Sequence, residues 1–147
     1  MRDKLQERIS GDVVEKRAIL LRNYLESGEA NLWPLHFPVG CCQIASLYFL
    51  ELLRRLDGVS GLLVANAKRG EACHAWAEVD NWIVDLTADQ FRDFAKPVFV
   101  ARSSPWHCSW MNADRLPYAR CGGGVARLRS YADFIRWIDT LTPGDLL

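Results

Sequence analysis

The sequence predicts an α+β fold in which N-terminal helices pack on a small antiparallel sheet. Two long apolar segments in the first third of the chain have helical spacing and no internal Pro or Gly. Short segments with turn signals between them follow, and an amphipathic segment lies near the end of the chain. Helices and strands that are segregated along the chain in this way are typical of α+β domains.

The first helix is expected over residues 12–27. Its apolar residues form one broad stripe at helical spacing, and Gly28 follows as a helix stop. Residues 29–40 contain Pro34 and Pro38 among several aromatic residues, a composition that predicts an ordered loop. This loop leads directly into the second helix.

The second helix is expected over residues 41–56. The segment is almost continuously apolar until its last turn, and such a length without Pro or Gly favours a buried helix over a strand. Gly58 fits the end of this helix. The Pro and Gly residues just before the segment place Cys41 or Cys42 in its first turn.

The strands are expected over residues 61–66, 73–79, 82–87 and 97–101. Between the second and third of these segments, Asp80 and Asn81 have the turn chemistry of a two-residue hairpin loop. Residues 102–124 are rich in Trp, Pro, Ser and Gly and predict no defined element. An amphipathic helix over residues 130–141, with Ser130 as its N-cap, is expected to close the domain.

Length and charge limit the classes to which the chain can belong. Its 147 residues fit a single domain over residues 1–147. Eighteen Lys and Arg balance eighteen Asp and Glu without an obvious basic stripe, so a nucleic-acid partner is not expected.

The N-terminus and the cysteines bear on location. The first residues are too charged for a secretory signal, and no apolar run approaches the ~20 residues that span a bilayer. We therefore expect a soluble protein, cytoplasmic or exported without a cleavable signal peptide, with no membrane partner. Five cysteines, an odd number, favour reduced thiols over a disulfide framework.

Cys42 is the candidate nucleophile because of its expected place at a helix start. The free N–H groups and positive dipole end of a helix N-terminus stabilise a thiolate. The same N–H groups could form part of an oxyanion hole for a tetrahedral intermediate. The alternative is that Cys41 and Cys42 are small buried hydrophobic residues, as cysteines often are.

His74 and Asp85 are the candidate base and the carboxylate that orients it. If Asp80 and Asn81 form a two-residue turn, the register places His74 and Asp85 on one face as diagonal neighbours. Asp85 could then bind one imidazole nitrogen while the other faces the thiol. A three-residue loop would place the two side chains on opposite faces. The alternatives are a core histidine and a turn or surface carboxylate.

Two stretches, FPVGCCQIAS and HAWAEVDNWIVDLTADQF, resemble the papain-like and transglutaminase-like cysteine hydrolases. In those proteins a Cys at a helix start precedes a His on one strand and an Asp or Asn on the next. The chain is similar in particular to small bacterial proteins with a Gly-x-Cys-x-x-Ala-Ser helix start, and to the lasso-peptide leader peptidases. The matched residues, all within residues 37–91, are Gly40, Cys42, Ala45, Ser46, His74, Trp76 and Asp85.

The resemblance implies a papain-like fold and a Cys-His-Asp catalytic triad. Cys42 would attack the carbonyl carbon of an amide in a protein or peptide to form a thioester, His74 would exchange the proton, and Asp85 would fix the imidazole. Water as the acceptor would give a peptidase, amidase or deamidase, and an amine would give a transglutaminase or acyltransferase. The substrate would be a leader peptide or, for a bacterial effector, a host or competitor protein. The competing class is a binding module that has lost activity.

The nucleophile and the oxyanion contacts stay open at this level. The doublet makes Cys41 an alternative nucleophile, and the Cys-x-x-x-Ser spacing to Ser46 favours Cys42. Papain-like enzymes often have an upstream Gln at the oxyanion hole, and none lies between Gln6 and Gln43. The candidates for substrate or oxyanion contacts are Cys41, Gln43, His36 and Trp76.

Other reactive groups are weaker candidates. His107 and Cys108 form the main rival pair, but adjacent residues of a strand or a helix point apart. The cysteines and histidines lack the Cys-x-x-Cys or His-x-x-x-His spacing of zinc sites, so neither a metal nor another cofactor is expected. The sequence leaves the oligomeric state open.

Overall fold

The structure, a computed structural model, describes residues 9–147. Five α-helices and five β-strands are present in this part of the chain. In chain order they are α1 (Gly11–Glu26), α2 (Cys42–Asp57), β1 (Leu62–Arg69), β2 (Ala72–Val79), β3 (Trp82–Asp85), β4 (Phe99–Ala101), α3 (Pro105–Cys108), β5 (Asp114–Pro117), α4 (Tyr118–Cys121) and α5 (Tyr131–Asp139). Three short 3₁₀ helices complete the set: η1 (Ala88–Gln90), η2 (Gly122–Arg127) and η3 (Pro143–Leu146).

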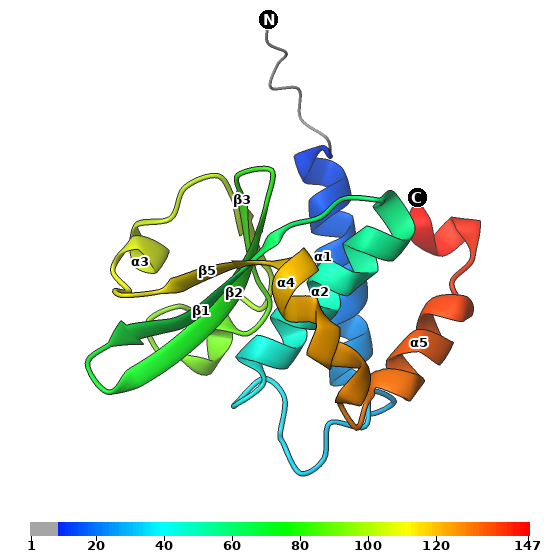
Figure 1. Ribbon diagram of the computed structural model, residues 1–147, viewed down its shortest axis with the longest axis horizontal. Coiled ribbons are helices and arrows are strands. Elements are labelled where there is room, and N and C mark those ends of the chain that lie inside the picture. The colour runs from blue at the N-terminus through cyan, green and yellow to red at the C-terminus, as the bar shows by residue number, and fades with distance from the viewer. Residues whose placement is uncertain (1–8) are drawn as a thin grey trace, which may run out of the picture.

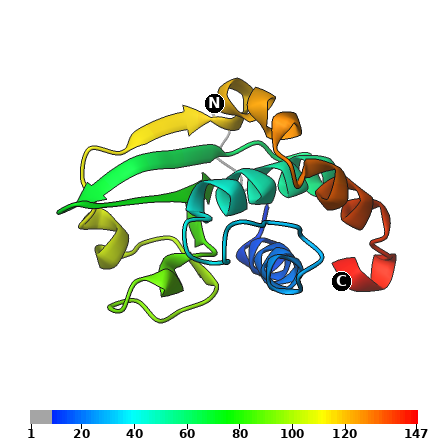
Figure 2. The same cartoon turned by 90° about the horizontal axis from the view of Figure 1, so that it is seen from below.

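The strands form one antiparallel sheet in the order β4-β3-β2-β1-β5. The β1–β2 hairpin extends away from α1, α2 and α5, which gather on the other side of the molecule (Figure 1). A view from below shows α3 beside the sheet and well separated from α1 (Figure 2). These features confirm the predicted α+β class with helices packed on a small antiparallel sheet.

The two long helices and one face of the sheet enclose the larger hydrophobic core. Ala75, Ala77 and Val79 alternate along β2 and face this core, as the period of a strand requires. Helix α2 contributes a nearly continuous run of buried residues, which explains its apolar sequence. Gly58 ends α2 in the left-handed conformation, with φ of 66°, and both long helices lie within one residue of their predicted bounds.

The β2–β3 hairpin has the predicted two-residue turn. Asp80 and Asn81 both have positive φ, 47° and 67°, the conformation of the turns that fit the twist of paired strands. Val79 therefore pairs with Trp82, and Ala77 with Val84. The register that places His74 and Asp85 on one face is confirmed.

The other face of the sheet carries a smaller, aromatic cluster. Val64, Ala67, Trp76 and Trp110 are buried in it, and Phe91 and Trp106 pack against it. Side chains from the stretch 102–124, for which no element was predicted, cover this face. The helices and strand of that stretch are too short to show a period in the sequence, which is why they escaped detection. Ser104 and Pro105, an N-cap followed by Pro at the first helical position, mark the start of α3.

Arg22 ties α1 to the loop that follows β3. Its Nη1 atom donates to the carbonyl oxygens of Leu86 at 2.8 Å and Pro97 at 2.9 Å, and its guanidinium also pairs with Asp89. The Arg22 side chain is 6% exposed. A buried cation with this many acceptors fixes the position of the segment that carries Asp85 into η1.

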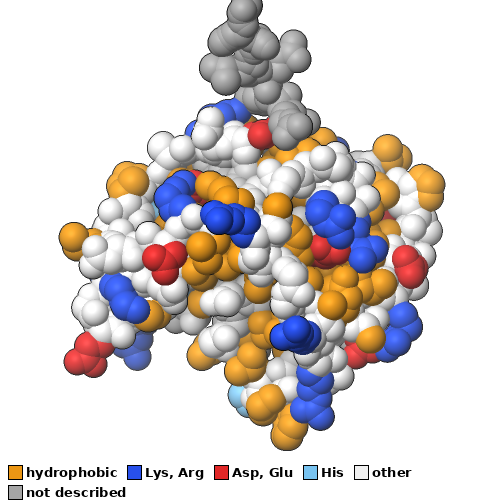
Figure 3. Space-filling model, viewed as in Figure 1, with side chains coloured by type: hydrophobic (Ala, Val, Ile, Leu, Met, Phe, Trp, Pro, Cys, Tyr) orange, Lys and Arg blue, Asp and Glu red, His pale blue; other side chains and the backbone are white. Residues whose placement is uncertain are grey.

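None of the helices within residues 9–147 combines the length and the apolar character needed to cross a membrane. On the face shown in Figure 3, Lys and Arg side chains are scattered among apolar and uncharged ones and form no continuous stripe.

Candidate active site

Cys42 is the first residue of α2, and its side chain is partly exposed. The N-cap residue, Cys41, makes no capping hydrogen bond with its side chain. The N–H groups of the first turn therefore keep the free donors that a helix start provides. Ser46 Oγ donates to the carbonyl oxygen of Cys42 at 2.7 Å, an interaction internal to the helix.

Cys41 is placed differently from its neighbour. Its side chain is fully buried, and its Sγ atom donates to the carbonyl oxygen of Val39 at 3.6 Å. Burial, with a smaller contribution from Cys42, raises the pKa of the Cys41 thiol. Of the doublet, Cys42 has the accessible sulfur at the helix start.

His74 and Asp85 are joined across the hairpin. His74 Nε2 lies 2.7 Å from Asp85 Oδ2, and each residue is 1% exposed. The other carboxylate oxygen, Oδ1, accepts the backbone N–H of Thr87 at 3.0 Å. Burial alone would raise the pKa of Asp85, but the hydrogen bonds from His107 and His74 lower it, so the carboxylate is ionised at neutral pH.

The pKa of His74 is strongly perturbed. Burial alone would lower it, but hydrogen bonds and charges of Asp85 and Cys42 raise the pKa to about 9. Asp85 engages Nε2, so Nδ1 is the nitrogen left for the thiol of Cys42. No group within residues 9–147 makes a well-formed hydrogen bond to Nδ1, although that atom is buried. The structure thus brings Cys42, His74 and Asp85 together, with the thiol and the carboxylate both interacting with His74.

His107, which the sequence offered only as part of a rival pair with Cys108, is a member of this site. Its Nε2 atom lies 2.7 Å from Asp85 Oδ2, the same oxygen that His74 contacts. Ser104 Oγ lies 2.6 Å from Nδ1 of His107 and also accepts its backbone N–H at 3.1 Å. Cys108, its neighbour in the sequence, is exposed and makes no side-chain hydrogen bond to His107 within residues 9–147. The Ser-Pro pair before His107 is the one local signal that could have placed it on a helix.

Histidine and carboxylate groups can also hold metal ions, and the ligand atoms of His74, Asp85 and His107 lie within 4.8 Å of one another. The 2.7 Å separations are those of charge-assisted hydrogen bonds, which explain the grouping without an ion. The expectation of a metal-free centre remains a prediction.

Aromatic side chains enclose the imidazole of His74. Its ring centroid lies 4.9 Å from Phe91, 5.4 Å from Trp110, 5.6 Å from Trp76 and 5.9 Å from Trp106. Trp76 is itself buried and lies against His107 as well, at 4.8 Å. These rings keep water from the His74–Asp85 pair, which strengthens the electrostatic interaction between them.

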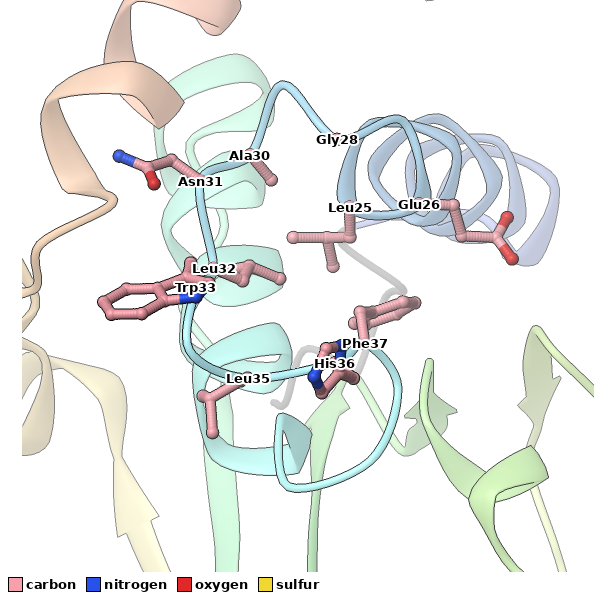
Figure 4. Close-up of a pocket in the computed structure, with 10 residues that line it drawn as sticks. All are labelled: Leu25, Glu26, Gly28, Ala30, Asn31, Leu32, Trp33, Leu35, His36 and Phe37. Atoms are coloured by element: carbon pink, nitrogen blue, oxygen red, sulfur yellow. The ribbon is translucent and has the colours of Figure 1, made fainter.

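The remaining candidates, Gln43 and His36, lie at the surface. Gln43 is exposed in the first turn of α2, and His36 is exposed in the loop before it. His36 lines an open hollow of about 490 Å³ together with Leu25 of α1, Phe37 and other residues of this loop (Figure 4). Within residues 9–147, neither side chain forms a hydrogen bond to Cys42 or His74.

Gln90 provides a link that the sequence did not indicate. Its Oε1 atom accepts the backbone N–H of Gly40 at 3.5 Å, and its Nε2 atom donates to the carbonyl oxygen of Thr87 at 3.0 Å. One carboxamide therefore connects the approach to α2 with the end of the hairpin. This contact helps to hold Cys42 near His74.

No known family model, curated protein or solved structure matches this chain. Arguments about its chemistry therefore depend on the arrangement of its own residues.

Proposed function

We propose that the protein is a thiol-dependent hydrolase that acts on amide bonds of a protein or peptide. Cys42 is the nucleophile, His74 the proton carrier and Asp85 the group that orients His74. In this proposal the chain is a member of the papain-like or transglutaminase-like superfamily. Its catalytic centre is formed by the start of α2 and the β2–β3 hairpin.

The observation that carries the proposal is the buried Nδ1 atom of His74. Buried ring nitrogens of histidine normally have a hydrogen-bond partner, and an exception is informative. Here Nε2 is bound by Asp85, and Nδ1, which has no well-formed hydrogen bond in the described chain, is left for Cys42, which contributes to the raised pKa of His74. A core histidine with a purely structural role would have both nitrogens satisfied. In His74, one ring nitrogen is left available to the Cys42 thiol.

The charges favour a reactive sulfur. With a pKa of about 9, the His74 imidazole is protonated at neutral pH. A cationic imidazole beside a thiol, together with a helix N-terminus, is the environment in which catalytic thiolates are found. Asp85, ionised and shielded from water, stabilises the cation.

The proposed reaction has two stages. The Cys42 sulfur attacks the amide carbonyl carbon, and the carbonyl electrons move to oxygen, where N–H groups of the first turn of α2 can stabilise the negative charge. Collapse of this intermediate breaks the C–N bond, and His74 gives its proton to the departing amine. Neutral His74 then takes a proton from water, whose oxygen attacks the thioester and releases the acid and the Cys42 thiolate.

Two alternatives share parts of this site. An amine in place of water would make the same residues a transglutaminase or acyltransferase. A catalytically inactive binding module would keep the fold while Cys42 had no enhanced reactivity. The transglutaminase or acyltransferase differs from the hydrolase only in the second stage of the reaction. An assay of the reactivity of the Cys42 sulfur therefore separates either enzyme from the binding module.

The test is alkylation by iodoacetamide near pH 6, with the labelled cysteine identified by mass spectrometry. We expect Cys42 to react rapidly, and His74→Ala to slow that reaction. The exposed Cys108 serves as an internal control. Cys73 is also exposed, but Lys68 Nζ donates to its sulfur at 3.1 Å and could activate it, so its labelling is compared separately. Equal, slow labelling of all exposed thiols, unchanged in His74→Ala, would eliminate the hydrolase and favour the binding module.

A further inference from the structure

Two histidines share one oxygen of Asp85, and their other nitrogens have opposite surroundings. His74 and His107 each place Nε2 at 2.7 Å from Asp85 Oδ2. The Nδ1 atom of His74 has no well-formed hydrogen bond in the described chain, whereas Ser104 Oγ lies 2.6 Å from the Nδ1 atom of His107. The first imidazole is thus free to move a proton, and the second is held at both ends.

The hydrogen bonds of Ser104 define the tautomer of His107. Ser104 Oγ accepts the backbone N–H of His107, so its own proton is available to Nδ1. A neutral His107 with its proton on Nδ1 would direct a lone pair of Nε2 at the carboxylate of Asp85, which is repulsive at 2.7 Å. The proton therefore sits on Nε2, and His107 donates to Asp85.

We propose that His107, held by Ser104, is a positioning residue that fixes the carboxylate of Asp85 for its work on His74. The functional centre then extends from Cys42 through His74, Asp85 and His107 to Ser104. Its catalytic meaning depends on the hydrolase proposed above, but its effect on Asp85 and His74 does not.

The physical role follows from the three donors that converge on Asp85. The N–H of Thr87 binds Oδ1, and the two imidazoles bind Oδ2, so the carboxylate cannot rotate without breaking at least one bond. The bond from His107 also draws negative charge away from His74. Removal of that donor should leave a stronger, less constrained anion beside the catalytic imidazole.

Other charged groups around His74 are few in the described structure. Cys42 approaches from α2, Asp85 from β3, and His107 from α3 through Asp85. Arg69 of β1 lies over the outer rings, 5.0 Å from the centroid of Trp106 and 4.6 Å from that of Trp110, and it pairs with the exposed Asp93. Variants at position 107 remove His107 and leave the other groups in place.

The experiment is an NMR titration of the His74 imidazole in folded variants, which needs no substrate. In His107→Leu, which removes the donor and keeps the site apolar, we expect the pKa of His74 to rise by about one unit. His107→Gln offers an amide N–H near the lost Nε2–H and should return the pKa toward the wild-type value. Ser104→Ala should produce a smaller rise, because it removes the hydroxyl that orients the ring.

Acylation by p-nitrophenyl acetate provides the kinetic readout, followed by release of p-nitrophenolate. We expect the rate constant to fall about tenfold or more in His107→Leu, with partial recovery in His107→Gln. Cys108→Ser, an exposed neighbour on the same helix, is the matched control and should equal the wild type in both assays.

The inference is overturned if His107→Leu and Cys108→Ser give the same His74 pKa. Should His107→Leu fail to fold, Ser104→Ala decides: a raised His74 pKa supports the role, and a wild-type value refutes it. If the variants change the His74 pKa as expected but the wild-type protein is not acylated, the role of His107 stands and the hydrolase proposal fails. If the wild-type protein is acylated but the variants do not change the His74 pKa, the hydrolase proposal stands and the role of His107 fails.

Discussion

His74 Nε2 lies 2.7 Å from Asp85 Oδ2, although eleven positions of chain and a hairpin turn separate the two residues. Each residue is 1% exposed, so the interaction is strong and insensitive to salt. Its two partners hold each other in charged form at neutral pH, with the pKa of His74 raised and that of Asp85 lowered.

Asp85→Asn should keep the fold and lose most of the reactivity of Cys42. The change removes the negative charge that raises the pKa of His74, so that pKa should fall. We expect acylation by p-nitrophenyl acetate to slow by about 10²- to 10⁴-fold. Asp139→Asn, at an exposed carboxylate at the end of α5, is the control and should be silent. An Asp85→Asn variant with wild-type turnover would remove Asp85 from the centre.

Stability should depend on pH through the same pair. The pKa of His74 rises from 6.5 to about 9 on folding, so its contribution is complete below pH 6.5 and is lost as the pH rises through 9. The pKa of Asp85 falls below 3.8, so its contribution is present above that pH and is lost in acid.

Urea unfolding at pH 6, 7.5 and 9.5 measures the alkaline limb. We expect the free energy of unfolding to decline by up to about 3 kcal/mol over this range, since one pKa unit corresponds to about 1.4 kcal/mol. His74→Gln should flatten the decline. A wild-type curve that stays level to pH 9.5 would contradict the raised pKa of His74.

The two adjacent cysteines should differ in their response to substitution. Cys42→Ala should abolish rapid alkylation and acylation, because it removes the sulfur at the helix start. Cys41→Ala should keep both activities and destabilise the fold by about 1 kcal/mol, because the Cys41 side chain is fully buried. Mass spectrometry of the labelled protein and urea unfolding check the two expectations. Loss of activity in Cys41→Ala alone would reverse the assignment.

Arg22→Leu should destabilise the protein by about 3 kcal/mol, because it leaves Asp89 and two carbonyl oxygens without their donor. Glu26→Gln, at the half-exposed partner of the same arginine, should cost less than about 1 kcal/mol. Urea unfolding of both variants measures the difference. Equal losses would show that Arg22 acts through its surface pair alone.

The sequence could predict those parts of the site whose positions depend on local structure, namely helical spacing and hairpin register. A segment of sixteen mainly apolar residues predicts α2. A two-residue turn dictates which side chains of the hairpin share a face, so Cys42, His74 and Asp85 could be proposed together. His107 could not be, because its bond to Asp85 depends on how the segment between β3 and α3, which contains η1 and β4, folds back over the sheet. Gln90 was missed for the same reason, since it reaches Gly40 across fifty positions.

The short turn at Asp80 and Asn81 also restricts how this chain can have changed over time. A single inserted or deleted residue between His74 and Asp85 would turn one strand over and send a carboxylate into the apolar core beneath α2. An insertion in this hairpin would therefore have to add equal numbers of residues to β2 and β3. We expect distant relatives to keep the spacing between His74 and Asp85 even where the rest of the sequence differs.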